Sequence, residues 1–187
     1  MFRTVMTACA ITVVVCLSTV ANAAAKVTVA SGGCSAFDAV ARDEAGRQRA
    51  IDAVLCSVNR LRASNGARPL RASRPLTVAA TAHSSQMIAQ AFFSHVSTDG
   101  AGVRRRAMRA GYIRRSRSAL VDETIAWGSG RFATPAQLVE SFLQSALHRA
   151  ALLDGRYRDA GIGLLLGAPA AGVSGPAATL TLDLGRR

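Results

Sequence analysis

The chain has 187 residues, enough for one domain with a single sizeable core. Its 23 basic and 11 acidic side chains give a formal net charge of +12 at pH 7, which suits contact with anionic surfaces. Aromatic residues make up only 5% of the chain, which argues against a stacking platform for single-stranded nucleic acid. Nucleic acid is therefore not an expected partner.

The N-terminus has the order of a secretory signal peptide. Arg3 supplies a positive charge, residues 8–20 are apolar, and Ala21-Asn22-Ala23 matches an A-x-A cleavage site. The apolar run is shorter than the roughly 20 residues that a membrane-spanning helix needs. We expect residues 1–23 to be a cleaved signal peptide, which leaves a mature chain without a transmembrane span that is secreted or periplasmic.

Cleavage at that point leaves two of the four cysteines, Cys34 and Cys56. Because secreted proteins fold in an oxidising compartment, we expect these two cysteines to form a disulfide. The disulfide would tie an N-terminal leader segment, residues 24–42, onto the first helix of a domain that spans residues 43–187. The leader is rich in small residues, and we expect it to be poorly ordered except near Cys34.

Hydrophobic residues at helical spacing predict four helices before residue 153. Their expected ranges are about 43–64, 75–92, 101–109 and 134–152. The last of them begins with Thr134-Pro135-Ala136-Gln137, a capping residue followed by proline and then glutamine at the third helical position. Before it, "VDETIAWGSG" is expected to be a loop, with Trp127 as a packing residue.

The C-terminal part changes character. "AGIGLLLG" and "AATLTLDLG" are typical of strands, and the glycine- and proline-containing "APAAGVSGP" joins them as a loop. Two such strands form a hairpin that needs a partner surface, which the helices can supply. Helices first and strands last indicate an α+β fold.

Seven arginines gather within residues 104–117, and Tyr112 is the only aromatic residue among them. They are Arg104, Arg105, Arg106, Arg109, Arg114, Arg115 and Arg117. Such a run can bind a polyanion, for example lipid headgroups or an anionic polymer of the cell envelope. It can equally be a solvated basic face, and the sequence leaves both interpretations open.

The three histidines are the candidate functional residues. His83 shares a helical stripe with apolar residues, which favours a buried, hydrogen-bonded histidine. His95 and His148 follow or end helices, and the acidic pair Asp122-Glu123 lies between them in the sequence. Two imidazoles and a carboxylate suit a divalent metal such as zinc, or proton transfer near neutral pH. The chain has no H-E-x-x-H, C-x-x-C or G-x-S-x-G motif, so spacing alone does not choose between these roles.

Several segments resemble a known family in the same order along the chain. The stretch that opens with "LCSVNRLRASNGARPL" and ends with "AFFSHVSTDG" is followed by "AGY", "ETIAWG" and "TPAQLVESFLQSALHRAALLDGRYRDAGIGLLLG". Together, over roughly residues 50–185, they resemble the bacterial branch of the CAP superfamily. That superfamily groups cysteine-rich secretory proteins, venom antigens and pathogenesis-related proteins, whose shared unit is the SCP domain.

The resemblance implies a three-layer α-β-α sandwich with an open cleft, which in eukaryotic members is lined by two histidines and two acidic residues that can hold zinc. By motif, His95 of "FSH" is similar to the first histidine, Glu123 of "DETIA" to the first carboxylate, and His148 of "ALHRA" to the second histidine. The position of the other carboxylate falls on Ser145. The resemblance thus implies a tentative metal or catalytic set of His95, Glu123 and His148, less negative than in the family.

Three functions remain as hypotheses. We favour a secreted, non-catalytic binding module whose cleft takes a lipid or an envelope component, or contacts a protein, because one carboxylate is missing. The first alternative is a hydrolase that depends on zinc or another divalent cation held in the same cleft. The second alternative is a polyanion binder that acts through residues 104–117.

Overall fold

The computed structural model describes residues 33–114 and 118–187. Its elements in chain order are α1 (Glu44–Ser64), β1 (Arg71–Ala72), α2 (Arg74–Ala89), α3 (Val103–Arg109), β2 (Leu120–Ser129), the 3-10 helix η1 (Gly130–Ala133), α4 (Pro135–Gln144), α5 (Ala146–Leu153), β3 (Asp159–Leu166) and β4 (Ala177–Arg186). The expected signal peptide lies outside the described residues. None of the described helices is long and apolar enough to cross a membrane.

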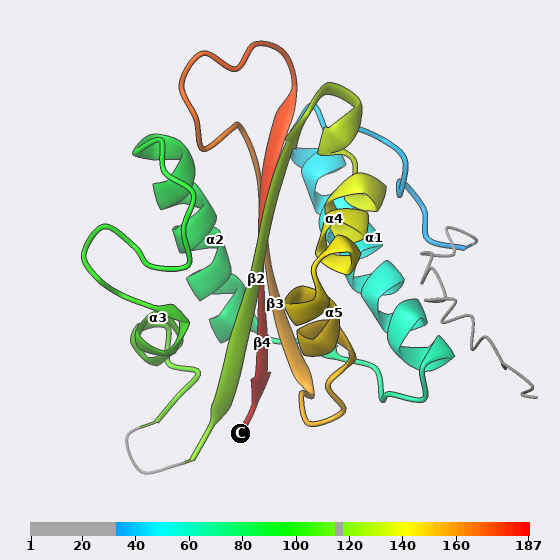
Figure 1. Cartoon of the computed structure of the whole chain (residues 1–187), viewed down its shortest axis with the longest axis vertical. Helices are drawn as coiled ribbons and strands as arrows, with labels where there is room; N and C mark the ends of the chain where they lie inside the picture. The colour runs from blue at the N-terminus through cyan, green and yellow to red at the C-terminus, as the bar shows by residue number, and fades with distance from the viewer. Residues whose placement is uncertain (1–32, 115–117) are drawn as a thin grey trace, which may run out of the picture.

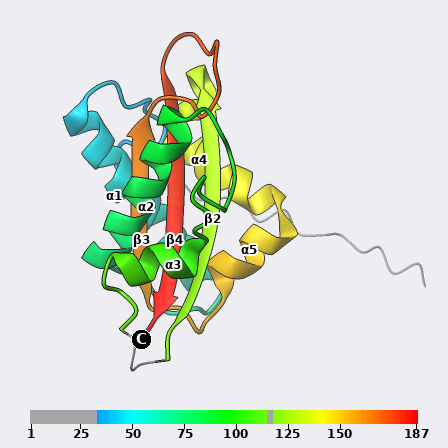
Figure 2. The same ribbon diagram turned by 90° about the vertical axis from the view of Figure 1, so that its left-hand side faces the viewer.

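The strands form one sheet in the order β1-β3-β4-β2. β4 pairs antiparallel with both β3 and β2, and β2 pairs with it along ten residues without interruption. Figure 1 shows the sheet edge-on with β2 in front, α2 and α3 on one side, and α1, α4 and α5 on the other. Figure 2, turned by 90°, shows α2 and α3 in front of the sheet, where they cover one of its faces. The predicted α+β class and three-layer sandwich are confirmed.

The two faces of the sheet are chemically different. Toward α1, α4 and α5 the strands present large apolar side chains, among them Leu180, Leu182 and Leu184, which are fully buried in the main core. Burial of such side chains stabilises the fold by about 1.5–3 kcal/mol each. Toward α2 the same strands present glycines and polar residues, so this face is closed by hydrogen bonds as well as by apolar contacts.

Two glycines of β3 allow α2 to lie directly on the sheet. A Cβ atom at Gly161 or Gly163 would fall 2.1–2.4 Å from backbone atoms of Leu76, Thr77, Ala80 or Thr81. In the space that results, Ser84 Oγ donates to the carbonyl of Gly163 at 2.6 Å. This close approach fixes the helix that leads into His95.

On the other side of the sheet, a buried arginine anchors the end of α5. Arg62 Nη1 donates to the carbonyls of Leu152 at 2.5 Å and Asp154 at 3.1 Å, and Arg62 Nε donates to that of Arg68 at 2.8 Å. The last carbonyls of a helix have no hydrogen-bond partners within the helix. A cation at the C-terminal end donates hydrogen bonds to them and interacts favourably with the partial negative charge of the helix dipole. Burial lowers the pKa of Arg62, and the nearby charge of Arg158 lowers it further, while the carboxylate of Asp154 acts in the opposite direction.

Two local expectations are wrong. The segment "VDETIAWGSG" is not a loop, because its first nine residues lie in the edge strand β2. The single helix expected over residues 134–152 is two helices, since Ser145 leaves the helical conformation and caps α5 with its hydroxyl. Near Cys34 the leader packs on the domain, because Phe37 is buried and its carbonyl accepts from the N–H of Ala136. Residues 24–32 lie outside the described part. The Cys34–Cys56 disulfide is confirmed.

The fit of α2 on β3 predicts a large cost for one added methyl group. Gly163→Ala should lower the free energy of unfolding by about 3 kcal/mol, because the Cβ meets the backbone of Ala80, which cannot rotate away. Gly155→Ala is the control, because no heavy atom lies within 4 Å of its added Cβ. Urea unfolding of both variants measures the difference, and equal stabilities would contradict the described packing.

Candidate functional site

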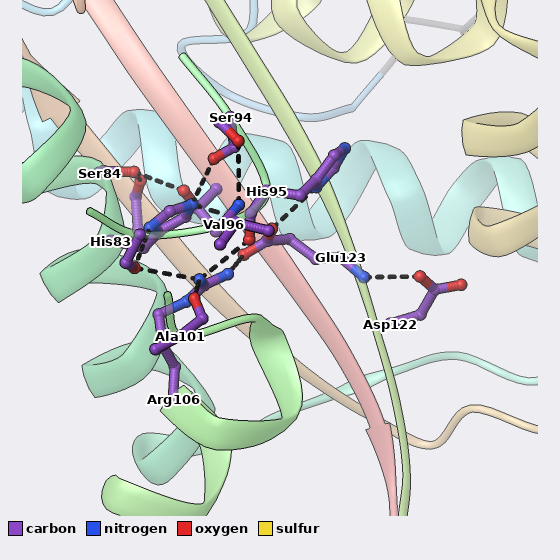
Figure 3. Close-up of polar contacts among 12 residues, drawn as sticks. His83, Ser84, Ser94, His95, Val96, Ala101, Arg106, Asp122 and Glu123 are labelled. Carbon is purple, nitrogen blue, oxygen red and sulfur yellow. Dashed lines mark hydrogen bonds and ion pairs between the residues drawn. The ribbon is translucent and has the colours of Figure 1, made fainter. Parts of the chain in front are cut away.

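Glu123 is the centre of the candidate site. It lies on β2 with its side chain toward α2 and α3, and it is buried. Its Oε1 accepts from Nδ1 of His95 at 2.8 Å, and its Oε2 is paired with Nη2 of Arg106 (Figure 3). Although burial alone would raise the pKa of Glu123, these partners hold that pKa below its ordinary value. Glu123 is therefore a carboxylate with both oxygens occupied.

Arg106 joins Glu123 to the segment between α2 and α3. Its Nη1 donates to the carbonyls of Ala101 at 2.6 Å and His95 at 3.0 Å, and to Oγ of Ser97 at 3.2 Å. The side chain is only 6% exposed. Its inclusion in the polyanion-binding set is therefore corrected: Arg106 is a buried counter-ion of the site and cannot reach a polymer at the surface.

The other arginines of the expected set lie elsewhere. Arg104, Arg105, Arg109 and Arg114 are exposed. Two of them already have partners, since Arg109 pairs with Asp99 and Arg104 Nη1 donates to the carbonyl of Ala119 at 3.1 Å. Arg115 and Arg117 lie outside the described residues.

His95 reaches Glu123 from a tight turn after α2. Ala91 ends the helix in the left-handed region, at φ 49°, and the chain then turns back along the sheet. Because Nδ1 of His95 donates to Glu123, Nε2 is the ring nitrogen left for a ligand. The side chain is half exposed, and the hydrogen bond that it donates to Glu123 raises the pKa of His95 above its ordinary value.

His83 is a buried support of the same network. Its Nε2 donates to the carbonyl of Ser94 at 2.9 Å, and its Nδ1 accepts from Oγ of Ser97 at 3.2 Å. Burial lowers the pKa of His83, and the ring stays neutral in this environment. The expectation of a hydrogen-bonded core histidine is confirmed.

His148 faces His95 from the first turn of α5. The two ring centroids lie 6.1 Å apart, and the His148 ring stands edge-on against Phe142 at 5.7 Å. Burial, and then the positive charge of His95, lower the pKa of His148. The structure thus brings the two predicted histidines together, but the pKa of His95 is raised and the pKa of His148 is lowered.

A cavity of about 460 Å³ opens between these elements. His95, His148, Asp122 and Glu123 form its polar part, and Val96, Val103, Leu147 and Ala151 form its apolar part. Leu147 stands 82% exposed at this site. We refer to this cavity as the cleft. The residues that line it include no serine, threonine or cysteine, so no side-chain hydroxyl or thiol lies there as a nucleophile.

The donor set does not fit a three-ligand zinc site. Catalytic zinc commonly takes three protein ligands. His95 and His148 offer imidazole nitrogens, but both oxygens of Glu123 are held by His95 and Arg106. Among residues 33–114 and 118–187, no group of three or more histidine, cysteine or acidic side chains is placed to hold a metal ion. Glu123 instead orients the ring of His95.

A second carboxyl group lies beside Glu123. Asp183 is its partner in the β2–β4 register and is fully buried. Neither oxygen of Asp183 receives a hydrogen bond from a described donor. Burial and the neighbouring charge of Glu123 raise the pKa of Asp183 well above its ordinary value. Asp183 is thus held as a neutral acid, whose proton can bond to the Glu123 carboxylate.

The model of the cysteine-rich secretory protein family, CAP, matches residues 55–170, which is more than half of the chain. The chain belongs to the CAP family. A search of curated proteins finds no match.

Solved structures support the CAP fold. An extracellular protein containing an SCP domain from Bacillus anthracis superposes with a TM-score of 0.60 at 18% identity, over 78% of this chain and 44% of that one. An outer surface protein from Borrelia burgdorferi gives 0.58 at 17%, over 72% and 90% of the two chains. A cysteine-rich secretory protein from Staphylococcus aureus gives 0.52 at 17%, over 76% and 41%. The CAP chain spans less than half of the first and third of these proteins.

Sequence reasoning missed two residues of this CAP site. Arg106 is one of several arginines in sequence, and it differs from the others of α3 only because its side chain is buried in the fold. Asp183 stood in an apolar strand, "AATLTLDLG", where an isolated acid is a signal of a buried, perturbed carboxyl group.

The buried acid predicts a pH dependence of stability. The pKa of Asp183 is higher in the folded than in the unfolded chain, so its stabilising contribution is complete below about pH 4 and is lost as the pH rises toward the folded pKa. Asp183→Asn keeps a donor for Glu123 but cannot ionise. The variant should therefore gain stability relative to the parent between pH 5 and pH 8.

Urea unfolding at several pH values measures this difference, and contributions from the histidines cancel between the two curves. Asp183→Ala also cannot ionise but removes the donor, so it should be about 1–3 kcal/mol less stable than Asp183→Asn at every pH. Parallel curves for the parent and Asp183→Asn would contradict a neutral Asp183.

Proposed function

We propose that this CAP domain is a secreted binding module, which holds an amphipathic lipid or another envelope component in the cleft and does not catalyse a reaction. One observation supports this most directly. The one buried carboxylate of the cleft, Glu123, is bonded to His95 and Arg106, and these partners hold its pKa below the ordinary value, which makes it a weak general base.

The lining of the cleft suits a molecule with one polar and one apolar part. Nε2 of His95 can donate to an anionic or hydroxyl group, since the raised pKa keeps this ring charged at higher pH than usual. Val96, Val103 and Leu147 can cover an apolar portion. Exposed apolar side chains around a polar centre commonly mark a binding surface.

Oleate is a probe with both parts, and NMR signals of the two imidazoles report on the cleft directly. Titration of the purified protein should shift the signals of His95 and His148 saturably. Leu147→Asp should weaken binding at least tenfold, because it places a charge against the apolar part of the ligand. Leu166→Asp, at an exposed apolar side chain outside the cleft, should bind like the parent.

The same samples test the hydrolase alternative. We expect no stoichiometric zinc in the parent above the level of a His95→Ala/His148→Ala double variant. Stoichiometric zinc that a folded double variant loses, together with hydrolysis of a peptide or phosphodiester substrate, would overturn the non-catalytic proposal.

Polyanion binding has a separate signature. If Arg104, Arg105 and Arg114 carried the function, binding to an anionic polymer would fall steeply with salt and with neutralisation of these residues. Oleate binding in the cleft would be unchanged in such variants.

A further inference from the structure

A second hollow continues the cleft beyond His148, toward the C-terminal end of β2. It has a volume of about 430 Å³ and shares His148 with the cleft. Phe93 and Trp127 line it from the sheet side, and Ser141, Gln144 and Ser145 line it from the end of α4. We call this hollow the aromatic groove. Figure 1 shows α4 and α5 beside β2 at the front edge of the sheet.

Both aromatic side chains of the groove are open to solvent. Trp127 is 37% exposed and Phe93 is 45% exposed. Trp127, expected to be a packing residue, is partly exposed, and its side chain also borders this hollow. Large aromatic surfaces left open in a concavity lose contact with water only when a ligand covers them, which favours binding.

The polar side chains of the groove keep unused hydrogen-bonding capacity. Ser145 Oγ accepts from the N–H of His148 at 3.4 Å, which leaves its O–H as a donor. Gln144 Nε2 donates one hydrogen to Glu140 at 2.7 Å, which leaves a second N–H and the carbonyl oxygen. Ser141 Oγ donates to the carbonyl of Leu138 at 2.7 Å and can still accept. These groups offer donors and acceptors together.

The aromatic groove carries no formal charge. No acidic, lysine or arginine side chain lines it, and burial lowers the pKa of His148, so that this ring is mainly neutral at neutral pH. A charged ligand would find no counter-ion here. An acyl chain would cover Ser141, Gln144 and Ser145 without replacing their bonds to water, which costs free energy.

A sugar ring satisfies both properties of the groove. Its C–H faces are apolar and pack on the negative faces of aromatic rings, while its hydroxyl groups both donate and accept hydrogen bonds. We propose that the aromatic groove binds an uncharged saccharide unit of a linear glycan, with Trp127 and Phe93 as the stacking surfaces and Gln144 and Ser145 as hydrogen-bonding partners. The continuation of the same ligand into the cleft rests on the proposed function.

The chain supplies its own reporter, because Trp127 is its single tryptophan. Titration of the purified protein with chitotetraose, and separately with maltotetraose, should shift Trp127 fluorescence to shorter wavelength in a saturable way for at least one of them. The shift is expected because the sugar displaces water from the indole. The concentration at half saturation gives the dissociation constant.

Substitutions of exposed side chains inside and outside the groove separate the loss of stacking from effects of any surface substitution. Phe93→Ala keeps the reporter and should weaken binding roughly tenfold. Gln144→Leu removes hydrogen bonds at an exposed position and should also weaken binding. Leu166→Ala is the control for Phe93→Ala, since Leu166 is also an exposed large apolar side chain but lies outside the groove. It should bind like the parent.

Each outcome decides the proposal. No saturable change with either glycan, or equal binding by Phe93→Ala and the parent, would overturn it. A Trp127 shift with oleate or an apolar peptide but with neither glycan would also overturn it and assign the groove to that ligand. If oleate shifts the histidine signals while neither glycan changes Trp127 fluorescence, the groove proposal fails and the cleft proposal stands. The reverse result would leave the groove proposal standing alone.

Discussion

The ion pair between Glu123 and Arg106 is the constraint on which the site depends. A carboxylate that is buried this deeply is strongly destabilising unless cations and hydrogen bonds compensate it. Glu123 obtains both from Arg106 and His95. Because these three residues come from β2, α3 and the segment after α2, one interaction holds three parts of the chain in register.

The two faces of the sheet carry different side chains and have different roles. Leucines of β4 and apolar residues of α1, α4 and α5 form a core that stabilises the domain. The opposite face carries Glu123, Asp183 and Thr181, and Gly161 and Gly163 bring α2 close enough to cover them. A polar layer of this kind specifies a unique arrangement of its members, because each must find its partner. The cleft lies at the edge of that layer, where His95 emerges into solvent.

The sequence revealed most of the fold and part of the site. Helical periodicity located α1 and α2 to within three residues, since the buried residues of each recur at helical spacing. It failed at β2, where the polar triplet Asp122-Glu123-Thr124 resembles a loop. Those polar side chains are covered by tertiary partners that no local pattern reports.

The site residues divide in the same way. His95, Glu123 and His148 were found because their motifs resemble those of the CAP family. The role of Glu123 as a support for His95, in place of a metal ligand, depends on Arg106, which comes from a different helix. Asp183 depends on strand register, because only the pairing of β2 with β4 brings it beside Glu123. Such contacts between distant segments cannot be derived from spacing along one of them.

The central claim is that Glu123 holds His95 as a donor facing the cleft. The most direct test is an NMR titration of the His95 imidazole in the parent and in Glu123→Gln. In the parent, the pKa of His95 should lie above the ordinary value of about 6.5 and Nδ1 should stay protonated, while Glu123→Gln should lower that pKa. A parent His95 that titrates at or below the ordinary value would contradict this description of the site.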